Sequence, residues 1–172
     1  IVGSAGDSGC GRSTLLKLIY GQLGNGLELF SGNASWHVAE TATANKAEIG
    51  LSDVKSLWWD KITYVPQVVN ALNPILRVRD QVMDSMPARL KQNGTAALQS
   101  DLTAFFKELG LSEDVFDMFP FQLSGGMIQR VLIGLAAFPR PDMILADEPT
   151  TALDVVVQKR ILILLHRIQR SI

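Results

Sequence analysis

Apolar residues recur at helical spacing through the middle of the chain, from residue 79 to residue 118. Gly110 suits the end of one predicted helix there, because glycine readily adopts the left-handed conformation that ends many helices. Ser112, with two acids after it, and Ser124 suit the starts of the next two helices. The helix that ends at Gly110 is expected to have one apolar face, formed by Leu98, Leu102, Phe105, Phe106 and Leu109. The helix that begins at Ser124 is expected to bury Met127, Val131, Leu132 and Leu135.

Two short apolar runs predict strands. Residues 62–65 (Ile-Thr-Tyr-Val) are rich in β-branched and aromatic side chains and end at a proline. Residues 143–146 (Met-Ile-Leu-Ala) precede two acids and have the composition of a buried parallel strand. Residues 14–19 predict a helix that ends near Gly21 or Gly24, and residues 27–57 are expected to hold short strands and a helix. This order predicts an α/β fold with helices around a mostly parallel sheet and a helical insert in the middle.

Both ends of the sequence have the pattern of interrupted elements. Ile1 and Val2 have the character of the end of a strand. A helical stripe runs towards residue 172 without a capping residue, through Val157, Ile161, Leu164, Leu165 and Ile168. We therefore expect both ends to continue in a longer polypeptide.

The composition limits the class of protein. The chain has 172 residues, 47% of them hydrophobic, which is enough for one domain with a packed core. The formal net charge is -1 with both signs scattered, so nothing indicates a basic nucleic-acid surface. Cys10 is the only cysteine, which excludes a disulfide framework and favours a reducing compartment. The longest aliphatic run, residues 161–165, is too short to span a bilayer, so membrane association is expected only through partners.

A glycine-rich stretch near the start has the spacing of a phosphate-binding loop. Residues 6–13 (Gly-Asp-Ser-Gly-Cys-Gly-Arg-Ser) fit the pattern G-x-x-x-x-G-[K/R]-[S/T]. The glycines allow backbone N–H groups to converge on phosphate oxygens, and the helix that follows adds the positive end of its dipole. The hydroxyl of Ser13 suits Mg²⁺. A glycine-rich turn without a ligand is the alternative interpretation of this motif taken alone.

Arg12 stands where such a loop ordinarily has lysine. Its charge is permanent, and a guanidinium can bind phosphate through two parallel hydrogen bonds. It is also larger than an ammonium group and planar, so the exchange alters a tightly packed site. Cys10 is interpreted as a small residue that the loop tolerates rather than as a reactive thiol.

Two further motifs can carry chemistry. Asp147 and Glu148 follow the predicted strand at residues 143–146, and ligands of α/β sheets bind at the carboxyl ends of strands. Because successive side chains on a strand point in opposite directions, one acid can serve Mg²⁺ while the other meets an attacking water. Residues 123–130 (Leu-Ser-Gly-Gly-Met-Ile-Gln-Arg) predict a helix that begins at Ser124 with an open, anion-attracting end. The alternatives are an exposed polar strand end and an ordinary capped helix.

Together and in this order, these motifs resemble the ATP-binding subunits of ABC transporters over nearly the whole chain. The matching stretches are residues 6–14 for Walker A, Gln67 for the Q-loop, residues 123–129 for the LSGGQ-type signature, residues 146–148 for Walker B and residues 151–154 for the D-loop. A narrower resemblance to the peptide/nickel importers appears in residues 71–74 (Ala-Leu-Asn-Pro), residues 119–122 (Phe-Pro-Phe-Gln) and residues 146–158. The implied fold is that of a P-loop NTPase with a helical subdomain that carries the signature.

The resemblance implies a role for each matching residue, with ATP and Mg²⁺ as cofactors. Glu148 is expected to orient and deprotonate the attacking water, and Gln67 to contact Mg²⁺ or that water and to report to the membrane subunit. In this family two nucleotide-binding domains enclose two ATP molecules, so Ser124 and Gly126 are expected to contact the γ-phosphate held by the partner, and Asp154 to stabilise that contact. Nucleotide contacts fall to Gly6, Ser8, Gly9, Cys10, Gly11, Arg12, Ser13 and Thr14, and Mg²⁺ contacts to Ser13, Gln67 and Asp147.

The resemblance also implies a domain plan and partners. Residues 1–78 are expected to form the P-loop core with the Q-loop, residues 79–135 the helical subdomain with the signature, and residues 136–172 the Walker B strand, D-loop and following helix of an incomplete domain. The implied function is ATP hydrolysis that powers import of peptides or a similar small solute. The implied partners are a second nucleotide-binding domain and transmembrane permease subunits, at the inner face of the cell membrane, with no nucleic acid.

Departures from the family pattern define the alternative functions. Arg12 replaces the family lysine, and the switch histidine and the adenine-stacking aromatic residue would lie outside this sequence. A nucleotide-binding module that does not hydrolyse ATP is therefore the alternative. A chromosome-maintenance ATPase is disfavoured because the segment between the motifs has no sustained heptads. The histidines and tryptophans are interpreted as surface or packing residues: His37, His166, Trp36, Trp58 and Trp59.

Overall fold

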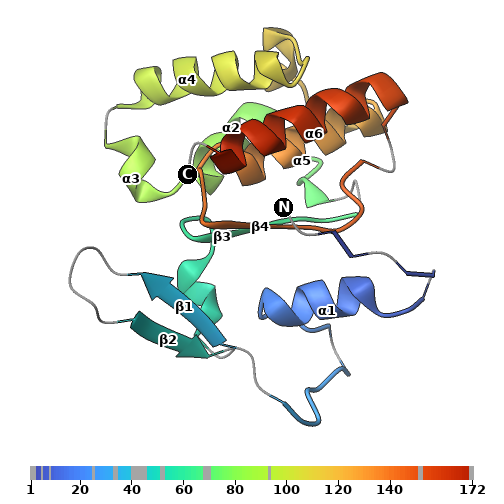
Figure 1. Ribbon diagram of the computed structural model, residues 1–172. Coiled ribbons are helices and arrows are strands. Elements are labelled where there is room, and N and C mark those ends of the chain that lie inside the picture. Colours follow the sequence, from blue (N-terminus) through green and yellow to red (C-terminus); the bar gives the residue numbers. More distant parts are fainter. Residues whose placement is uncertain are drawn as a thin grey trace. The chain divides into compact units, whose positions relative to one another are not determined.

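The computed structural model divides the chain into two compact units, residues 2–58 and residues 59–172 (Figure 1). The residues that the structure describes are 3–4, 6–7, 9–24, 26–32, 35–39, 46–50, 53–67, 71–92, 94–150 and 153–170. Within these ranges no helix combines the length and the apolar character that crossing a bilayer requires.

The first unit holds one helix, a hairpin and a short 3₁₀ helix. The helix α1 spans Arg12–Ile19, as the sequence predicted to within two residues. The strands β1 (Ser35–Ala39) and β2 (Lys46–Gly50) pair in antiparallel fashion, and the 3₁₀ helix η1 spans Val54–Leu57. The expectation of strands and a helix between residues 27 and 57 is thus confirmed, with the helix of the 3₁₀ type.

Trp58 is a packing residue, as the sequence predicted. Its ring stacks on Tyr20 with the ring centroids 4.7 Å apart. Its indole Nε1 donates a hydrogen bond to the Tyr20 carbonyl oxygen over 2.9 Å. The contact fixes the end of α1 to the end of η1, because Tyr20 and Trp58 are the residues that directly follow these two helices.

The second unit contains a parallel strand pair. The strands β3 (Ile62–Val65) and β4 (Met143–Ala146) lie side by side, with Ile62 opposite Met143 and Val65 opposite Ala146. The remaining elements are α2 (Val78–Ser85), α3 (Ala88–Lys91), α4 (Thr95–Glu108), η3 (Glu113–Asp117), η4 (Pro120–Gln122), α5 (Gly125–Ala137) and α6 (Val155–Arg170). Parallel strands need a crossover connection, and here the connection contains the helical insert that the sequence predicted.

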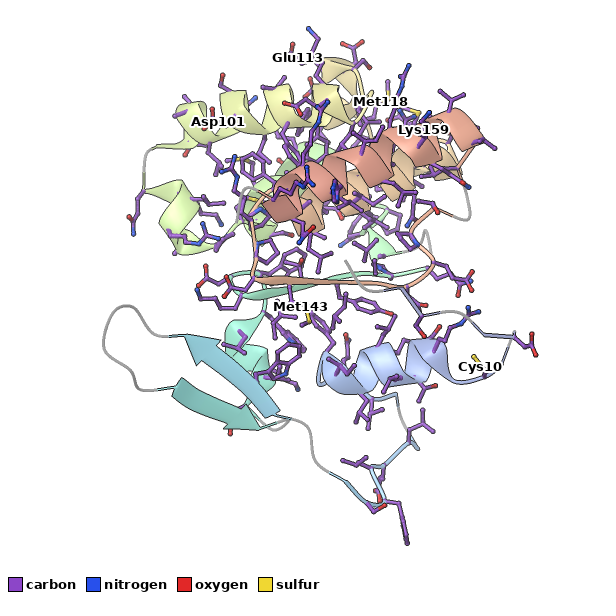
Figure 2. The ribbon with its side chains drawn as sticks, in the orientation of Figure 1. Cys10, Asp101, Glu113, Met118, Met143 and Lys159 are labelled. Carbon is purple, nitrogen blue, oxygen red and sulfur yellow. The ribbon has the colours of Figure 1, made fainter. Side chains whose placement is uncertain are left out.

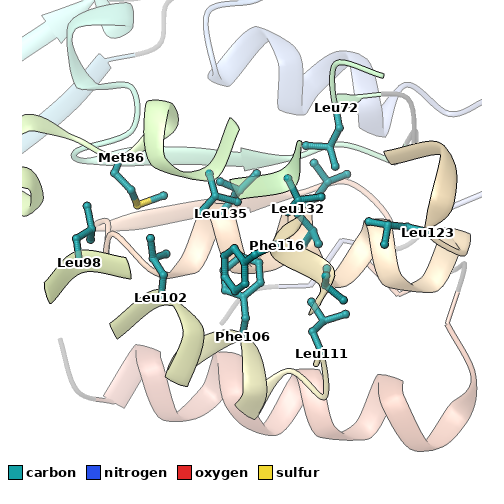
Figure 3. Packing of buried hydrophobic residues seen from close by; sticks show 14 residues of the cluster. Leu72, Met86, Leu98, Leu102, Phe106, Leu111, Phe116, Leu123, Leu132 and Leu135 are labelled. Carbon is teal, nitrogen blue, oxygen red and sulfur yellow. The ribbon is translucent and has the colours of Figure 1, made fainter. Parts of the chain in front are cut away.

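One hydrophobic core lies among α2, α4, η3 and α5 (Figure 3). Phe106 of α4 is 1% exposed and packs on Phe116 with ring centroids 5.0 Å apart. Gly134 lets α4 and α5 approach closely, since a Cβ atom there would lie 2.7 Å from Phe106 Cζ. The other fully enclosed members include Val78, Val82, Leu102, Val115 and Val131.

A second core joins the strand pair to α5 and α6, which cover one of its faces (Figure 1). Val65 of β3 packs there with Ile133 of α5 and Ile161 of α6. Thr63 Oγ1 donates a hydrogen bond to the Ala136 carbonyl oxygen over 2.8 Å, which ties β3 to α5. The predicted apolar stripe of α6 is confirmed at Val157, Ile161, Leu165 and Ile168, whereas the side chain of Leu164 is outside the described set.

The predicted helix ends are confirmed at two positions and modified at a third. Gly110 has φ 73° and its N–H donates to the Lys107 carbonyl oxygen, which closes α4. Ser124 Oγ accepts a hydrogen bond from the Met127 N–H and begins α5. Ser112 begins the 3₁₀ helix η3 without a side-chain cap. The backbone turn from Val115 N–H to Ser112 oxygen replaces that cap.

The expectation that residues 143–146 form a buried strand is partly wrong. Leu145 is buried, but Met143 is 39% exposed. Ile144 and Ala146 pack in the core with α5 and α6, so the alternating side chains of Met143 and Leu145 lie on the other face, where the first residue of the strand is left partly exposed. The strand itself, and its parallel pairing, are as predicted.

Candidate functional site

The glycine-rich loop before α1 uses glycine for its backbone conformation. Gly9 and Gly11 have φ values of 83° and 89°, a region that side chains other than glycine rarely adopt. Gly11 is the N-cap of α1. A Cβ atom at Gly9 or at Gly11 would meet no atom within 4 Å, so space is open beside both residues. Left-handed residues directly ahead of a helix are the elements of a backbone anion-binding loop.

Arg12 and Ser13 form the first turn of α1 and are both half-buried. The turn has no acidic residue, so no carboxylate of its own neutralises the positive end of the helix. Thr14 follows and is exposed. The positions of Arg12, Ser13 and Thr14 therefore suit an anion at the start of α1. Ser8, the remaining predicted loop residue, lies outside the described residues.

Gly6 and Cys10 lie close together in the loop. A Cβ atom on Gly6 would lie 2.8 Å from Cys10 Sγ, so a side chain there would require the thiol to move. The Cys10 N–H donates to the Asp7 carbonyl oxygen over 3.2 Å, which closes a turn inside the loop. Cys10 itself is exposed (Figure 2).

The two acids after β4 have different environments. Asp147 is 5% exposed, and its N–H donates to the Val65 carbonyl oxygen over 2.9 Å, which extends the pairing with β3 beyond the end of β4. Glu148 is exposed and has φ 47°, so the chain turns sharply out of the strand at this residue. The two neighbouring carboxylates thus differ in exposure, and their separate roles towards Mg²⁺ and water stay predictions.

Tyr64 is a residue that the sequence reasoning missed. Its hydroxyl donates a hydrogen bond to Asp147 Oδ2 over 3.1 Å. Burial raises the pKa of the Tyr64 hydroxyl above its ordinary value, and the negative charge of Asp147 and the hydrogen bond to it act in the same direction. The phenol therefore stays protonated and serves Asp147 as a donor.

Gln67 and Glu148 meet at the ends of the parallel strands. Gln67 Nε2 donates to Glu148 Oε2 over 2.9 Å. Gln67 comes two residues after β3, and Glu148 two residues after β4, so parallel pairing brings both to one edge of the sheet. The sequence assigned both residues to catalysis from separate motifs, and the structure brings them together.

The signature segment begins α5. Ser124 and Gly125 are exposed, and a Cβ atom on Gly125 would meet no atom within 4 Å. The Ser124 hydroxyl caps its own helix through the Met127 N–H at 3.3 Å. Gly126 is half-buried, and its carbonyl oxygen accepts a hydrogen bond from Arg130 Nε over 3.1 Å. The first residues of α5 are thus exposed, and hydrogen bonds from Met127 and Arg130 hold Ser124 and Gly126 in place.

Arg130, also missed from the sequence, links α5 to the end of α4. Its guanidinium donates to the Gly110 carbonyl oxygen over 2.6 Å and to the Leu109 carbonyl oxygen over 3.3 Å. Burial lowers the pKa of Arg130, and the negative charge of Asp154 acts in the opposite direction. The sequence signal for such a donor is Gly110, which marks the end of α4, because the last carbonyl oxygens of a helix need hydrogen-bond donors from elsewhere.

Leu153 and Asp154, the described part of the D-loop, are fixed to the start of α6. Asp154 Oδ1 accepts hydrogen bonds from the Val156 and Val157 N–H groups at 3.1 and 3.0 Å, so Asp154 caps α6. Gln158 Nε2 donates to the carbonyl oxygens of Thr150 and Leu153 at 2.9 and 3.1 Å. The capping role of Asp154 is compatible with its predicted role at a dimer contact, which stays a prediction.

Over the ranges that the structure describes, no three His, Cys, Asp or Glu residues cluster as metal ligands. A divalent ion at these acids would therefore take other ligands as well. Mg²⁺ is usually held by one or two carboxylates together with substrate phosphates. The glycine-rich loop belongs to the first unit and the two acids to the second, and their meeting at one nucleotide stays a prediction.

The fold and these motifs define an α/β P-loop NTPase of the ATP-binding cassette type. The solved cassette MJ0796, a dimer in a post-hydrolysis state bound to ADP and Pi, matches with a TM-score of 0.73 and 29% identity, over 96% of this chain and 67% of that chain. A family model described as ABC transporter matches residues 1–151. The chain belongs to the ABC transporter family.

Curated relatives point to one branch of that family. The dipeptide transport ATP-binding protein DppD of Haemophilus influenzae is 33% identical over 178 residues, which cover 99% of this chain and 51% of that protein. The oligopeptide transport ATP-binding protein OppD of Escherichia coli is 31% identical, over 99% of this chain and 49% of that protein. The chain therefore spans about half the length of these curated relatives.

Proposed function

We propose that this chain binds and hydrolyses ATP with Mg²⁺, as the ATP-binding subunit of a transporter that imports peptides or a similar small solute. The observation that carries the proposal is the hydrogen bond between Gln67 and Glu148 beside the buried Asp147. The names of the relatives, dipeptide and oligopeptide transport ATP-binding proteins, support the class of solute.

The residues present fit a magnesium nucleotide. Gly9 and Gly11 leave open space beside a left-handed backbone, and the start of α1 favours negative charge. The candidate metal ligands all offer oxygen, the donor atom that Mg²⁺ prefers: the hydroxyl of Ser13, the carboxylate of Asp147 and the amide oxygen of Gln67. When bound, Mg²⁺ neutralises charge on the phosphates.

The protein's contribution to hydrolysis is positioning and charge. Glu148, exposed at the strand end, is the residue proposed to orient a water and accept its proton. Gln67 holds the Glu148 carboxylate by its Nε2, which fixes the direction in which the base points. Arg12 supplies positive charge at the start of α1 for the phosphates.

A second nucleotide-binding domain is the proposed partner of the signature segment. Ser124 and Gly126 would face the triphosphate of the other subunit, and Asp154 would support the contact. The dimeric form of the MJ0796 cassette supports this arrangement. ATP-dependent dimerisation of the Glu148→Gln variant, measured by size-exclusion chromatography, is the expected result, and a strict monomer with saturating ATP would argue against it.

The second proposed partner is a permease at the inner face of the membrane. Ile75 is 77% exposed and Phe121 is 74% exposed. Phe121 stacks on Phe119, and the Arg77 guanidinium lies 5.0 Å from the Phe119 ring centroid. Aromatic residues are enriched at protein–protein interfaces, so the stacked, exposed Phe121 supports an interaction surface here. Phe121→Ser is expected to reduce association with the permease subunits and to leave ATP affinity unchanged; equal association would contradict this assignment.

The loop that carries Ile75 is held by hydrogen bonds to the side chain of Gln81 in α2. Gln81 accepts a hydrogen bond from the Asn73 N–H at 2.7 Å through its Oε1, and its Nε2 donates to the carbonyl oxygens of Asn73 and Leu76. The loop follows Gln67 closely in the sequence.

The three-part domain division at residues 78 and 135 is part of this proposal. It is supported by the hydrophobic core of α2, α4 and α5, most of whose residues fall between these two positions.

One specific observation favours a nucleotide-binding module without hydrolysis, namely Arg12 at the position of the family lysine. Phosphate release with Mg-ATP separates the two functions when the chain is compared with Glu148→Gln and Arg12→Lys. The proposal predicts release that Glu148→Gln abolishes. Binding of ATP without release in the original chain, with release restored by Arg12→Lys, would establish the alternative.

A further inference from the structure

Tyr64 and Asp147 are joined across the parallel strand pair, although 83 residues separate them in the sequence. The Tyr64 hydroxyl lies 3.1 Å from Asp147 Oδ2. Tyr64 is opposite Leu145 in the strand register, and Asp147 follows Leu145 by two residues along the chain. Since side chains alternate along a strand, Leu145 and Asp147 point to the same face as Tyr64.

That face is the one away from α5. Thr63, the residue before Tyr64, donates its hydroxyl to the Ala136 carbonyl oxygen of α5 on the opposite face. The two neighbouring hydroxyls of β3 therefore have separate tasks. The Thr63 hydroxyl ties the strand to a helix, whereas the Tyr64 hydroxyl is directed at a nearly enclosed carboxylate, because Asp147 is only 5% exposed.

A buried carboxylate that is to support a metal must be held in one orientation. A hydroxyl bonded to one of its oxygens restricts rotation of the carboxylate group, and hydrogen bonds to metal ligands also tune how strongly they bind. The Tyr64 ring is half-buried and extends from a paired strand, so it is a rigid support for that hydroxyl.

We propose that Tyr64 is a positioning residue, whose hydroxyl orients Asp147 for the Mg²⁺ that accompanies ATP. This inference rests on the proposed function of Asp147. Tyr64 lies outside Walker A, the Q-loop glutamine, the signature and Walker B.

The test is an equilibrium titration of Mg²⁺, with binding of a fluorescent ATP analogue as the signal. It compares the original chain with Tyr64→Phe, which removes only the hydroxyl, and with Thr63→Val, which removes the neighbouring hydroxyl on the other face. Tyr64→Phe is expected to raise the Mg²⁺ concentration at half-saturation about tenfold. Affinity for the analogue in the presence of a metal chelator should stay the same. Thr63→Val should lower stability and leave the Mg²⁺ dependence unchanged.

A second variant keeps the result decisive. Tyr64→Leu lacks both the ring and the hydroxyl and should shift the Mg²⁺ dependence at least as far as Tyr64→Phe. If Tyr64→Phe keeps the original Mg²⁺ dependence, the hydroxyl does not act on the metal and the inference is overturned, and a change in Tyr64→Leu alone would then assign the effect to the ring. If the original chain binds the analogue at no Mg²⁺ concentration, the proposed function itself fails, which is a separate outcome.

Discussion

Gln67 donates a hydrogen bond to Glu148 over 2.9 Å, although 81 residues separate the two in the sequence. Parallel pairing of β3 and β4 brings the two side chains to one edge of the sheet. The same register places Tyr64 against Asp147. One strand pair thus assembles four polar side chains that can serve a phosphate, a metal ion and a water.

The backbone at Glu148 provides a test that does not depend on activity. At φ 47° a side chain costs conformational energy, whereas glycine adopts this region freely. Glu148→Gly should therefore be more stable than Glu148→Ala by about 1 kcal/mol, the reverse of the order within a helix. Urea denaturation of the two variants measures the difference. An alanine variant of equal or greater stability would show that the chain does not turn here in the left-handed conformation.

Substitution of Ser124 separates its capping role from its proposed contact with nucleotide. Asp caps helices as well as Ser does, so Ser124→Asp should unfold within about 0.5 kcal/mol of the original chain. The added negative charge should repel the triphosphate of the partner and abolish ATP-dependent dimerisation. Chemical denaturation and size-exclusion chromatography give the two readings.

The control for this prediction is Ser124→Ala, which lacks the cap and is expected to lose about 1 kcal/mol of stability. It adds no charge, so it should weaken dimerisation less than Ser124→Asp does. Full ATP-dependent dimerisation of Ser124→Asp would mean that the start of α5 does not face a nucleotide.

Two glycines of α5 should differ in how their replacement by alanine changes the free energy of unfolding. A Cβ atom at Gly134 would lie 2.7 and 2.8 Å from atoms of the Phe106 ring, so Gly134→Ala should cost about 1–3 kcal/mol. A Cβ atom at Gly125 meets nothing within 4 Å, so Gly125→Ala should be neutral or stabilise the helix by up to about 1 kcal/mol. Thermal unfolding of both variants checks the packing of α4 on α5. Equal stabilities would contradict the close approach at Phe106.

Local pattern predicted much of the fold. The apolar face of α4, the glycine that ends it and the serine that begins α5 can be read from spacing and side-chain chemistry alone. The two motifs did not by themselves predict that Gln67 and Glu148 meet; the meeting follows from the parallel pairing of β3 and β4, whose carboxyl ends lie at one edge of the sheet.

The support for these residues could not be predicted in the same way. The contact of Tyr64 with Asp147 depends on the register between two strands that are far apart in the sequence, and no local pattern fixes that register. Arg130 binds carbonyl oxygens at the end of α4, a partner chosen by the packing of two helices. The exposure of Met143 likewise depends on what surrounds the start of β4 rather than on its apolar sequence.

The central proposal is that the glycine-rich loop and the two acids bind one nucleotide–metal complex. Iron(II) can replace Mg²⁺ in such a complex, and with ascorbate and oxygen it cleaves backbone close to the metal. Cleavage that requires ATP is predicted at two places in the chain, near Ser13 and near Asp147, and it should disappear with excess Mg²⁺. Cleavage near Ser13 alone, with residues around Asp147 and Glu148 intact, would contradict the proposal.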